Sequence, residues 1–186
     1  MRVLDGKYRR QPLISRPSPK VRPTARRLRE TLFTLLAARV EDARFLDLCA
    51  GSGAVGIEAL SRGAQHVTFV DRSPKVCSCI ISNLNICGVQ DDQAEVWTGD
   101  AMHFLRSVET TSRVEPWEIA FYDPPYNTDY EPLLTLFGTS ALLEPRRGVL
   151  VIEHHCEYRL KERVEGLRRW RAVRQGDSCL SFYEQA

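Results

Sequence analysis

Short apolar runs alternate with helical patterns from residue 44 onward, and this alternation limits the folds that the chain can adopt. Runs of strand length occupy residues 45–48, 67–70, 94–97, 118–122 and 148–153. Helical patterns separate them at residues 55–61, 74–87, 102–108 and within 129–138. The alternation predicts an α/β fold, with a parallel sheet and helices on both of its faces. Two more runs, at residues 169–174 and 179–183, predict a C-terminal antiparallel hairpin that turns at Gly176-Asp177.

The N-terminal part of the chain departs from this alternation. Residues 1–23 are basic and rich in proline, so they predict an extended arm. A helix is expected over residues 25–38 after an N-cap at Thr24, with an apolar stripe that leaves Arg26, Arg27 and Arg29 outside it. Near the other end, residues 157–164 are also expected to be helical. The expected organisation is therefore a basic N-terminal arm (1–23) and a single domain (24–186).

The charge of the chain is divided unevenly. Its net charge is +2, but residues 1–30 carry ten Lys or Arg and two acids, a net +8, which leaves a net −6 on the remainder. A basic segment on a mildly acidic body is typical of proteins that bind polyanions, although it can also be a solubilising tail. No apolar stretch has the length of a membrane span and no apolar signal segment follows the basic N-terminus, so we expect a cytoplasmic protein.

A glycine-rich loop follows the first expected strand, where residues 47–56 read DLCAGSGAVG. The pattern G-x-G-x-x-G between a strand and a helix predicts a nucleotide-binding loop, because glycines permit a sharp turn and a close approach to the helix N-terminus. Asp47 stands just before the loop. A carboxylate there repels a diphosphate but pairs with the ammonium group of a methionine, and it can also cap the helix. The loop therefore favours S-adenosylmethionine over a dinucleotide.

Two more acids follow the next strands of the predicted sheet. Asp71 closes the second strand, where a carboxylate can accept hydrogen bonds from both ribose hydroxyls. Asp100 follows the third strand and can meet an adenine amino group. Because the carboxyl ends of parallel strands share one edge of a sheet, we expect both acids beside the glycine-rich loop.

The stretch Asp123-Pro124-Pro125-Tyr126 ends the fourth expected strand. Proline cannot donate to a sheet ladder, so the strand stops and its last carbonyls are left as acceptors. Asp123 and the carbonyl of Pro124 can hold both hydrogens of a planar amine and turn its lone pair toward a methyl donor. Tyr126 can stack on the base that carries the amine. An ordinary strand end with a Pro-Pro turn is the alternative.

The six cysteines form no CxxC pair and show no zinc-like spacing with the four histidines, so no metal site is expected. We expect free thiols rather than disulfides in a chain without an export signal. A cysteine nucleophile is left open as an alternative.

The whole chain resembles the RsmD-type bacterial methyltransferases, which modify a guanine N2 of small-subunit ribosomal RNA. The resemblance is carried by Arg22-Pro23-Thr24, residues 29–33 (RETLF), the glycine-rich loop, residues 56–64 (GIEALSRGA) and the Asp-Pro-Pro-Tyr stretch. It implies a Rossmann-like, seven-stranded sheet and S-adenosylmethionine as the cofactor. It also implies small-subunit rRNA as the partner, including rRNA within an assembling ribosomal subunit. We expect the enzyme to be a monomer.

Site residues are assigned by combining these motifs with the resemblance. The candidate catalytic residues are those of the strand-four corner: Asp123, Pro124 and Tyr126. The candidate cofactor-binding residues lie at the ends of the first three strands: Asp47, Ala50, Gly51, Ser52, Gly53, Asp71, Arg72, Asp100 and Ala101. The candidate RNA-binding residues belong to the N-terminal basic segment: Arg2, Lys7, Arg9, Arg10, Arg22, Thr24, Arg26, Arg27 and Arg29.

Three alternative functions fit parts of the sequence. DNA adenine-N6 methylation uses the same chemistry, but the chain has no separate target-recognition domain. A nicotinamide-dependent oxidoreductase would use the glycine-rich loop and Asp71, yet it leaves the Asp-Pro-Pro-Tyr corner unexplained. A non-catalytic RNA-binding module would retain the fold without needing an intact set of cofactor residues.

Overall fold

The computed structural model describes residues 1–15, 23–111, 115–125 and 127–186. In this part of the chain, eight strands form one sheet in the order β3-β2-β1-β4-β5-β8-β7-β6. The strands are β1 (Arg44–Leu48), β2 (His66–Asp71), β3 (Ala94–Thr98), β4 (Ile119–Tyr122), β5 (Val149–His155), β6 (Arg163–Val164), β7 (Leu167–Gln175) and β8 (Ser178–Gln185). The first five strands run parallel and the last three are antiparallel, so the predicted α/β fold with a C-terminal hairpin is confirmed.

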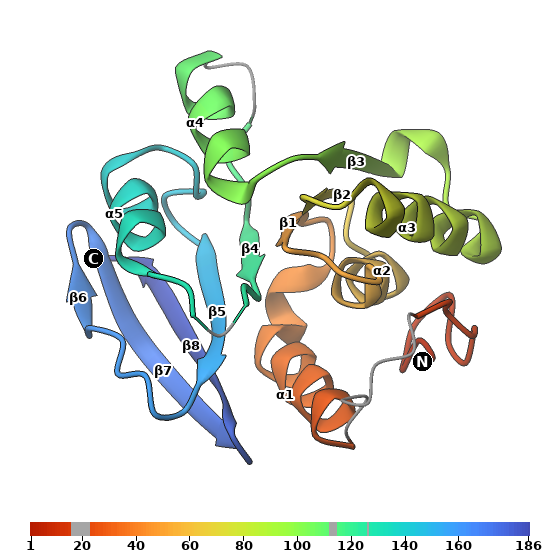
Figure 1. Cartoon of the computed structure of the whole chain (residues 1–186), viewed down its shortest axis with the longest axis horizontal. Helices are drawn as coiled ribbons and strands as arrows, with labels where there is room; N and C mark the ends of the chain where they lie inside the picture. The colour runs from red at the N-terminus through yellow and green to blue at the C-terminus, as the bar shows by residue number, and fades with distance from the viewer. Residues whose placement is uncertain (16–22, 112–114, 126) are drawn as a thin grey trace.

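Helices cover both faces of this sheet (Figure 1). They are α1 (Pro23–Val40), α2 (Ala54–Ser61), α3 (Pro74–Cys87), α4 (Ala101–Thr111) and α5 (Glu131–Thr139), with a 3-10 turn at Asp91–Gln93. Apolar side chains of α1, α2 and α3 form the core on one face, and those of α4 and α5 form the core on the other. None of the helices in the described part of the chain combines the length and apolar character that crossing a bilayer requires.

The sheet has one strand more than the seven expected. Residues 157–164, expected to be helical, instead lead into the short strand β6, which pairs with β7 through Val164 and Leu167. Glu165, at a φ of 49°, makes the tight turn between these two strands. Val164 and Leu167 are both buried, so packing against the sheet decides the conformation here. Near the other end of the chain, α1 begins at Pro23, which places Thr24 inside the helix rather than at its N-cap.

The N-terminal segment, residues 1–15, packs on the domain instead of extending from it. Val3, Tyr8 and Leu13 are buried in the core beside α1 and α2. The segment folds back on itself through an antiparallel bridge between Arg2 and Pro12. An extended arm was therefore the wrong expectation for this segment, because its apolar side chains are buried. The division of the chain at residue 23 stays a prediction.

The sheet topology creates a crevice between β1 and β4. From β1 the chain passes to β2 and β3 on one side, whereas β4 and β5 lie on the other side. The register pairs Asp47 of β1 with Phe121 of β4, so both strands end at the same level. The backbone N–H of Asp123 still donates to the carbonyl of Leu48, at 3.3 Å, just beyond β4. The loops after β1 and β4 therefore diverge at a topological switch point, the usual place for ligand binding in such sheets.

Candidate active site

Two adjoining pockets lie at the carboxyl ends of the parallel strands. The outer pocket has a volume of about 550 Å³, and its lining includes Asp71, Arg72, Asp100, Ala101, Tyr122 and Pro124. The inner pocket has a volume of about 220 Å³, and its lining includes Arg29, Asp47, Ala50, Gly51, Ser52 and Glu153. Cys49 and Asp123 belong to both linings, so the two pockets meet at these residues.

The glycine-rich loop forms one wall of the inner pocket. Cys49, Gly51 and Gly53 have positive φ angles of 61°, 57° and 74°, a conformation that glycine adopts without strain. Cys49 adopts it as a non-glycine residue, which costs on the order of 1–3 kcal/mol and is typical of functional loops. Gly56 serves packing instead, because a Cβ there would collide with the ring of Phe69 on β2. The pattern therefore combines a sharp turn with a close contact between helix and strand.

Asp47 is both a structural anchor and part of the pocket wall. Its side chain is buried, and its Oδ2 accepts a hydrogen bond of 2.9 Å from the backbone N–H of Gly56 in α2. Burial raises the pKa of Asp47 to about 8, with a smaller contribution from the charge of Asp71, while the hydrogen bond from Gly56 lowers it. The helix-anchoring alternative is thus present in the structure, and Asp47 also belongs to the lining of the inner pocket.

Asp71 and Asp100 lie in the outer pocket, as the strand pattern predicts. Asp71 accepts hydrogen bonds from the backbone N–H groups of Gly51, at 3.1 Å, and Ser73, at 2.9 Å, which tie the loops after β1 and β2 together. Asp100 is exposed and accepts a bond of 3.0 Å from the N–H of His103 in the first turn of α4. Both carboxylates are therefore held in place by backbone groups at the edge of the pocket.

The corner after β4 brings Asp123 to the junction of the pockets. Pro124 is buried and Pro125 is exposed. The carbonyl of Pro125 accepts hydrogen bonds from the backbone N–H of Thr128, at 3.1 Å, and from its hydroxyl, at 2.7 Å, which closes the turn. Tyr126 lies outside the described residues. The corner is thus a hydrogen-bonded turn that holds Asp123 where both pockets open.

Three carboxyl groups with raised pKa values surround the inner pocket. Burial raises the pKa of Glu153 to about 7, although a hydrogen bond with Ser178 lowers it. Desolvation by the surrounding protein, followed by the charges of Glu153 and Asp47, raises the pKa of Asp123. Asp123 is nevertheless exposed at the pocket mouth, so its desolvation is partial. Together with Asp47, these groups favour a cationic ligand, because a nearby positive charge stabilises ionised carboxylates.

Cys49 lies among these acids, but its surroundings oppose the nucleophile role. Burial, with further contributions from nearby carboxylates that include Asp123, raises the pKa of the Cys49 thiol to about 12. The thiol is therefore protonated at neutral pH, whereas a reactive cysteine needs its thiolate form.

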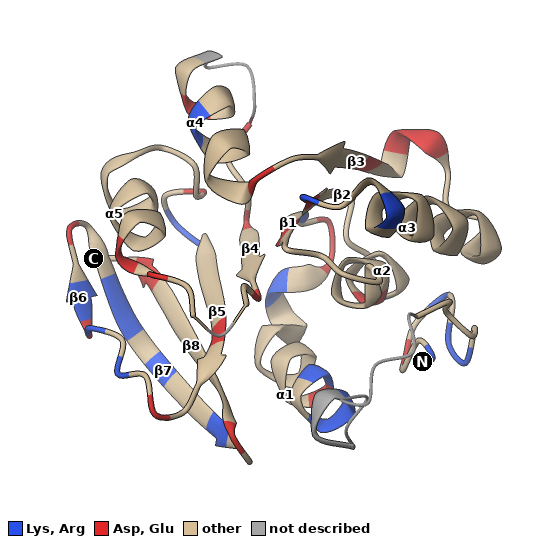
Figure 2. Ribbon diagram, viewed as in Figure 1, with Lys and Arg blue, Asp and Glu red and all other residues tan. Residues whose placement is uncertain are grey.

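The candidate RNA-binding residues occupy different environments. Arg2, Lys7, Arg9, Arg10, Arg26 and Arg27 are exposed, and Figure 2 shows basic residues on the N-terminal segment and on α1. Arg26 pairs with Glu30 at 3.0 Å. Arg29, which was expected outside the apolar stripe, is instead buried at 6% exposure, because the N-terminal segment and α2 cover this side of α1. Arg22 and the side chain of Thr24 lie outside the described part of the structure.

Glu153 and Cys49 line the site although the sequence did not single them out. Glu153 lies on β5, directly beside β4, and a carboxylate near the carboxyl end of a neighbouring strand was the signal that could have found it. Cys49 lies within the glycine-rich loop, but its positive φ angle has no sequence signature. Met102 and Thr128, in the outer pocket, follow strands three and four without a distinctive motif.

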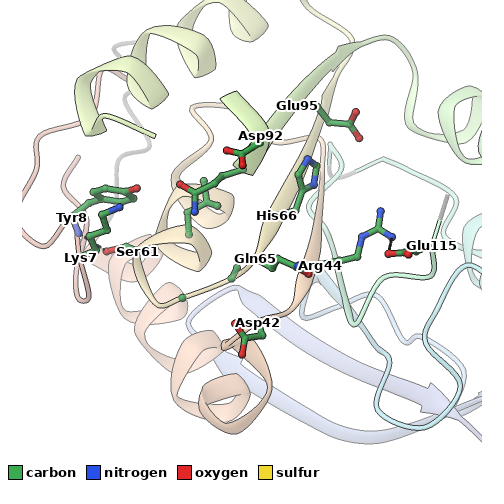
Figure 3. Close-up of a pocket in the computed structure, with 14 residues that line it drawn as sticks. Lys7, Tyr8, Asp42, Arg44, Ser61, Gln65, His66, Asp92, Glu95 and Glu115 are labelled. Atoms are coloured by element: carbon green, nitrogen blue, oxygen red, sulfur yellow. Dashed lines mark hydrogen bonds and ion pairs between the residues drawn. The ribbon is translucent and has the colours of Figure 1, made fainter. Parts of the chain in front are cut away.

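A larger cavity, of about 850 Å³, lies at the opposite edge of the sheet (Figure 3). It opens beside Arg44 and His66, which begin β1 and β2, and its wall includes Lys7 and Tyr8. Side chains of both charges line it, and the pair between Arg44 and Glu115, at 2.8 Å, spans part of its rim. Since ligands of doubly wound folds bind at the carboxyl ends of the strands, this cavity is not the candidate active site.

Comparison with known proteins identifies the family of the chain. The family model described as "Conserved hypothetical protein 95" matches residues 1–184. The chain belongs to this family. YlbH of Bacillus subtilis, named as a candidate rRNA methyltransferase, is 34% identical over 186 residues, which span 100% of this chain and 99% of YlbH. Ribosomal RNA small subunit methyltransferase D of Escherichia coli K12 is 40% identical over 126 residues, which span 68% of this chain and 60% of the relative.

Solved structures show the same fold. The Escherichia coli protein yhhF, described as a candidate methyltransferase, has a TM-score of 0.84 and 30% identity, with 100% of this chain and 97% of that chain covered. SMU.776, described as a candidate methyltransferase in complex with S-adenosylhomocysteine, has a TM-score of 0.70 at 13% identity, with 88% of this chain and 50% of that chain covered, and supports the fold alone. The resemblance to RsmD-type methyltransferases is therefore confirmed.

Proposed function

We propose that this RsmD-type family member transfers a methyl group from S-adenosylmethionine to the exocyclic N2 amine of a guanine in small-subunit rRNA. The observation that carries this proposal is the position of Asp123, which lines both pockets at their junction. A base bound at Asp123 would therefore lie next to a cofactor that occupies the two pockets. Family membership and the names of the relatives support rRNA methylation, and the corner supports an exocyclic amine as the acceptor.

The residues of the two pockets fit S-adenosylmethionine. The outer pocket suits a nucleoside, with Asp71 for the ribose hydroxyls and the Asp100-Ala101 segment for the adenine edge. The inner pocket suits the amino-acid part, because its carboxyl groups favour a cation. S-adenosylmethionine, which carries an ammonium and a sulfonium charge, supplies the methyl group when it is bound.

Asp123 has two tasks in this proposal. It accepts hydrogen bonds from the guanine amine and, with the carbonyl of Pro124, orients the nitrogen lone pair toward the methyl carbon. The methylated amine would carry an extra proton, which the carboxylate of Asp123 is placed to accept. A nearby positive charge favours the ionised form of Asp123 before the transfer, and its raised pKa then favours uptake of the proton. We assign base stacking to Tyr126.

The alternative functions are less compatible with the site. The pyrophosphate of a nicotinamide cofactor would oppose the ionisation of Asp47, Asp123 and Glu153, whereas a cationic ligand favours it, so the inner pocket fits such a cofactor poorly. The names of the relatives favour rRNA over DNA as the substrate. We further propose that the enzyme is monomeric and cytoplasmic and that it acts on rRNA, free or within an assembling subunit.

Nucleoside analysis tests this function directly. The purified chain is incubated with tritiated S-adenosylmethionine and either free small-subunit rRNA or immature particles, and the product nucleosides are identified by mass spectrometry. We expect N2-methylguanosine as the labelled product. Label in N6-methyladenosine would overturn the guanine assignment, and the absence of label from both substrates would contradict rRNA methylation.

Basic residues of the N-terminal segment are expected to bind RNA phosphates. Replacing exposed Lys7, Arg9 and Arg10 with glutamine should weaken RNA binding. The slope of the logarithm of the binding constant against the logarithm of the salt concentration should become shallower by about 2–3, since each lost phosphate contact removes about 0.7–0.9. Fluorescence anisotropy at several salt concentrations measures this slope. The matched control replaces three exposed arginines elsewhere with glutamine: Arg106, Arg146 and Arg163. Equal slopes for both triple variants would show that the segment has no special role in RNA binding.

A further inference from the structure

Arg29 is a buried cation whose hydrogen-bonding capacity is poorly used. It is 6% exposed, and it lies on α1 in the lining of the inner pocket. Its Nη2 donates to the carbonyl of Arg2 at 2.7 Å, whereas its Nη1 donates to the Sδ of Met1 at 3.0 Å, and a thioether is a weak acceptor. Its buried Nε has no hydrogen-bond partner among the described residues. The guanidinium therefore retains donors for a stronger acceptor.

The charge of Arg29 is also incompletely balanced. Its closest acidic group is Glu58, with an Nε to Oε2 distance of 4.0 Å. Glu58 already accepts a hydrogen bond of 2.9 Å from Nε of Arg62 and two more from the backbone N–H groups of Leu4, at 2.7 Å, and Asp5, at 3.0 Å. The negative charge of Glu58 is balanced mainly by Arg62, which lies closer to it than Arg29 does. Desolvation in this environment lowers the pKa of Arg29, as expected for a cation without a close partner.

The inner pocket presents opposite charges from different elements. Asp47, Asp123 and Glu153 come from the ends of β1, β4 and β5, and Arg29 comes from α1. Among the described residues that line this pocket, Arg29 is the only Lys or Arg. An α-amino acid group has the complementary arrangement, with an ammonium for the acids and a carboxylate for the guanidinium. Arginine binds carboxylates well because its planar group can donate two parallel hydrogen bonds.

We propose that Arg29 binds the carboxylate of the amino-acid part of S-adenosylmethionine. This inference rests on the proposed function, since it assigns the inner pocket to that part of the cofactor. It gives Arg29 a role in cofactor binding instead of the RNA-binding role expected from its place in the basic segment. The contact also ties α1 to the ligand, so cofactor binding should stabilise the N-terminal part of the domain.

Two ligands and two variants test the contact. S-adenosylhomocysteine carries the carboxylate, and 5′-deoxy-5′-(3-aminopropylthio)adenosine lacks only that group. Calorimetry measures the affinity of both ligands for the wild type, for Arg29→Met and for Arg62→Met. Arg62 is the matched control, because it also contacts Glu58 but does not line the pocket. Thermal unfolding without ligand checks that each variant is folded.

Arg29→Met is expected to bind S-adenosylhomocysteine about 10- to 100-fold more weakly, as the loss of a charge-assisted hydrogen bond predicts. Its affinity for the ligand without the carboxylate should equal that of the wild type, and Arg62→Met should resemble the wild type with both ligands. Equal weakening for both ligands, or no weakening for either, would overturn the role of Arg29. Failure of the wild type to bind S-adenosylhomocysteine would instead contradict the proposed function.

Discussion

Replacing Asp123 with alanine is expected to lower the rate of methyl transfer by about 100- to 10,000-fold, the range for a lost catalytic proton acceptor. The variant loses both the group that orients the guanine amine and the group that takes its proton. Cofactor binding should persist, because the residues that line the rest of both pockets are unchanged. Single-turnover rates on rRNA measure the chemical step, and calorimetry with S-adenosylhomocysteine measures cofactor binding.

Asp129→Ala is the matched control for this experiment. Asp129 is an exposed acid in the lining of the outer pocket, but its carboxylate accepts a hydrogen bond from the backbone N–H of Glu131 and belongs to the start of α5. We expect this variant to retain a rate within a few-fold of the wild type. A wild-type rate in Asp123→Ala would contradict the role that we assign to its carboxylate.

Replacing Glu58 with alanine is expected to lower the free energy of unfolding by about 3–5 kcal/mol, as happens when one partner of a buried ionic network is removed. Glu58 is fully buried, and its carboxylate binds Arg62 and the backbone N–H groups of Leu4 and Asp5. Alanine would leave these donors without their acceptor. Urea unfolding followed by circular dichroism measures the loss of stability.

Two further variants test whether the loss of stability comes from this buried network or from the removal of any acidic side chain. Glu30→Ala removes a half-exposed acid that pairs with Arg26 one helical turn away, so we expect a loss below about 1 kcal/mol. Glu58→Gln keeps an acceptor oxygen and should lose less stability than Glu58→Ala. Equal losses for Glu58→Ala and Glu30→Ala would show that the buried network contributes nothing beyond a surface pair.

Local sequence patterns predicted most of the sheet because its parallel strands are continuous apolar runs separated by helices. The glycine-rich loop and the placement of Asp47, Asp71 and Asp123 near the ends of strands were also predicted, since the end of each strand could be recognised. The strand β6 was missed because it is too short to show any periodicity, and its pairing depends on β7. Glu153 was missed because it reaches the site only through the pairing of β5 with β4, which the sequence of β5 does not reveal.

The environment of the N-terminal residues depends on partners that are distant in sequence. Composition predicted an extended arm, but Tyr8 is buried and its backbone N–H donates to the hydroxyl of Ser61. The burial of Arg29 likewise depends on partners distant in sequence, namely the N-terminal segment and Glu58 of α2. No local pattern reveals such contacts.

The docking of the N-terminal segment has a consequence for the order of folding. Leu4 binds Glu58, 54 positions later, and Ile14 binds Asn83, 69 positions later. During synthesis, this segment emerges before its partners exist, so its apolar side chains stay in solvent until α2 and α3 have been made. Met1 and Arg29 complete the wall of the inner pocket only after that docking. Because Asp123 and Glu153 also line this pocket, a ribosome-bound chain should acquire affinity for the cofactor only after β4 and β5 have left the exit tunnel as well.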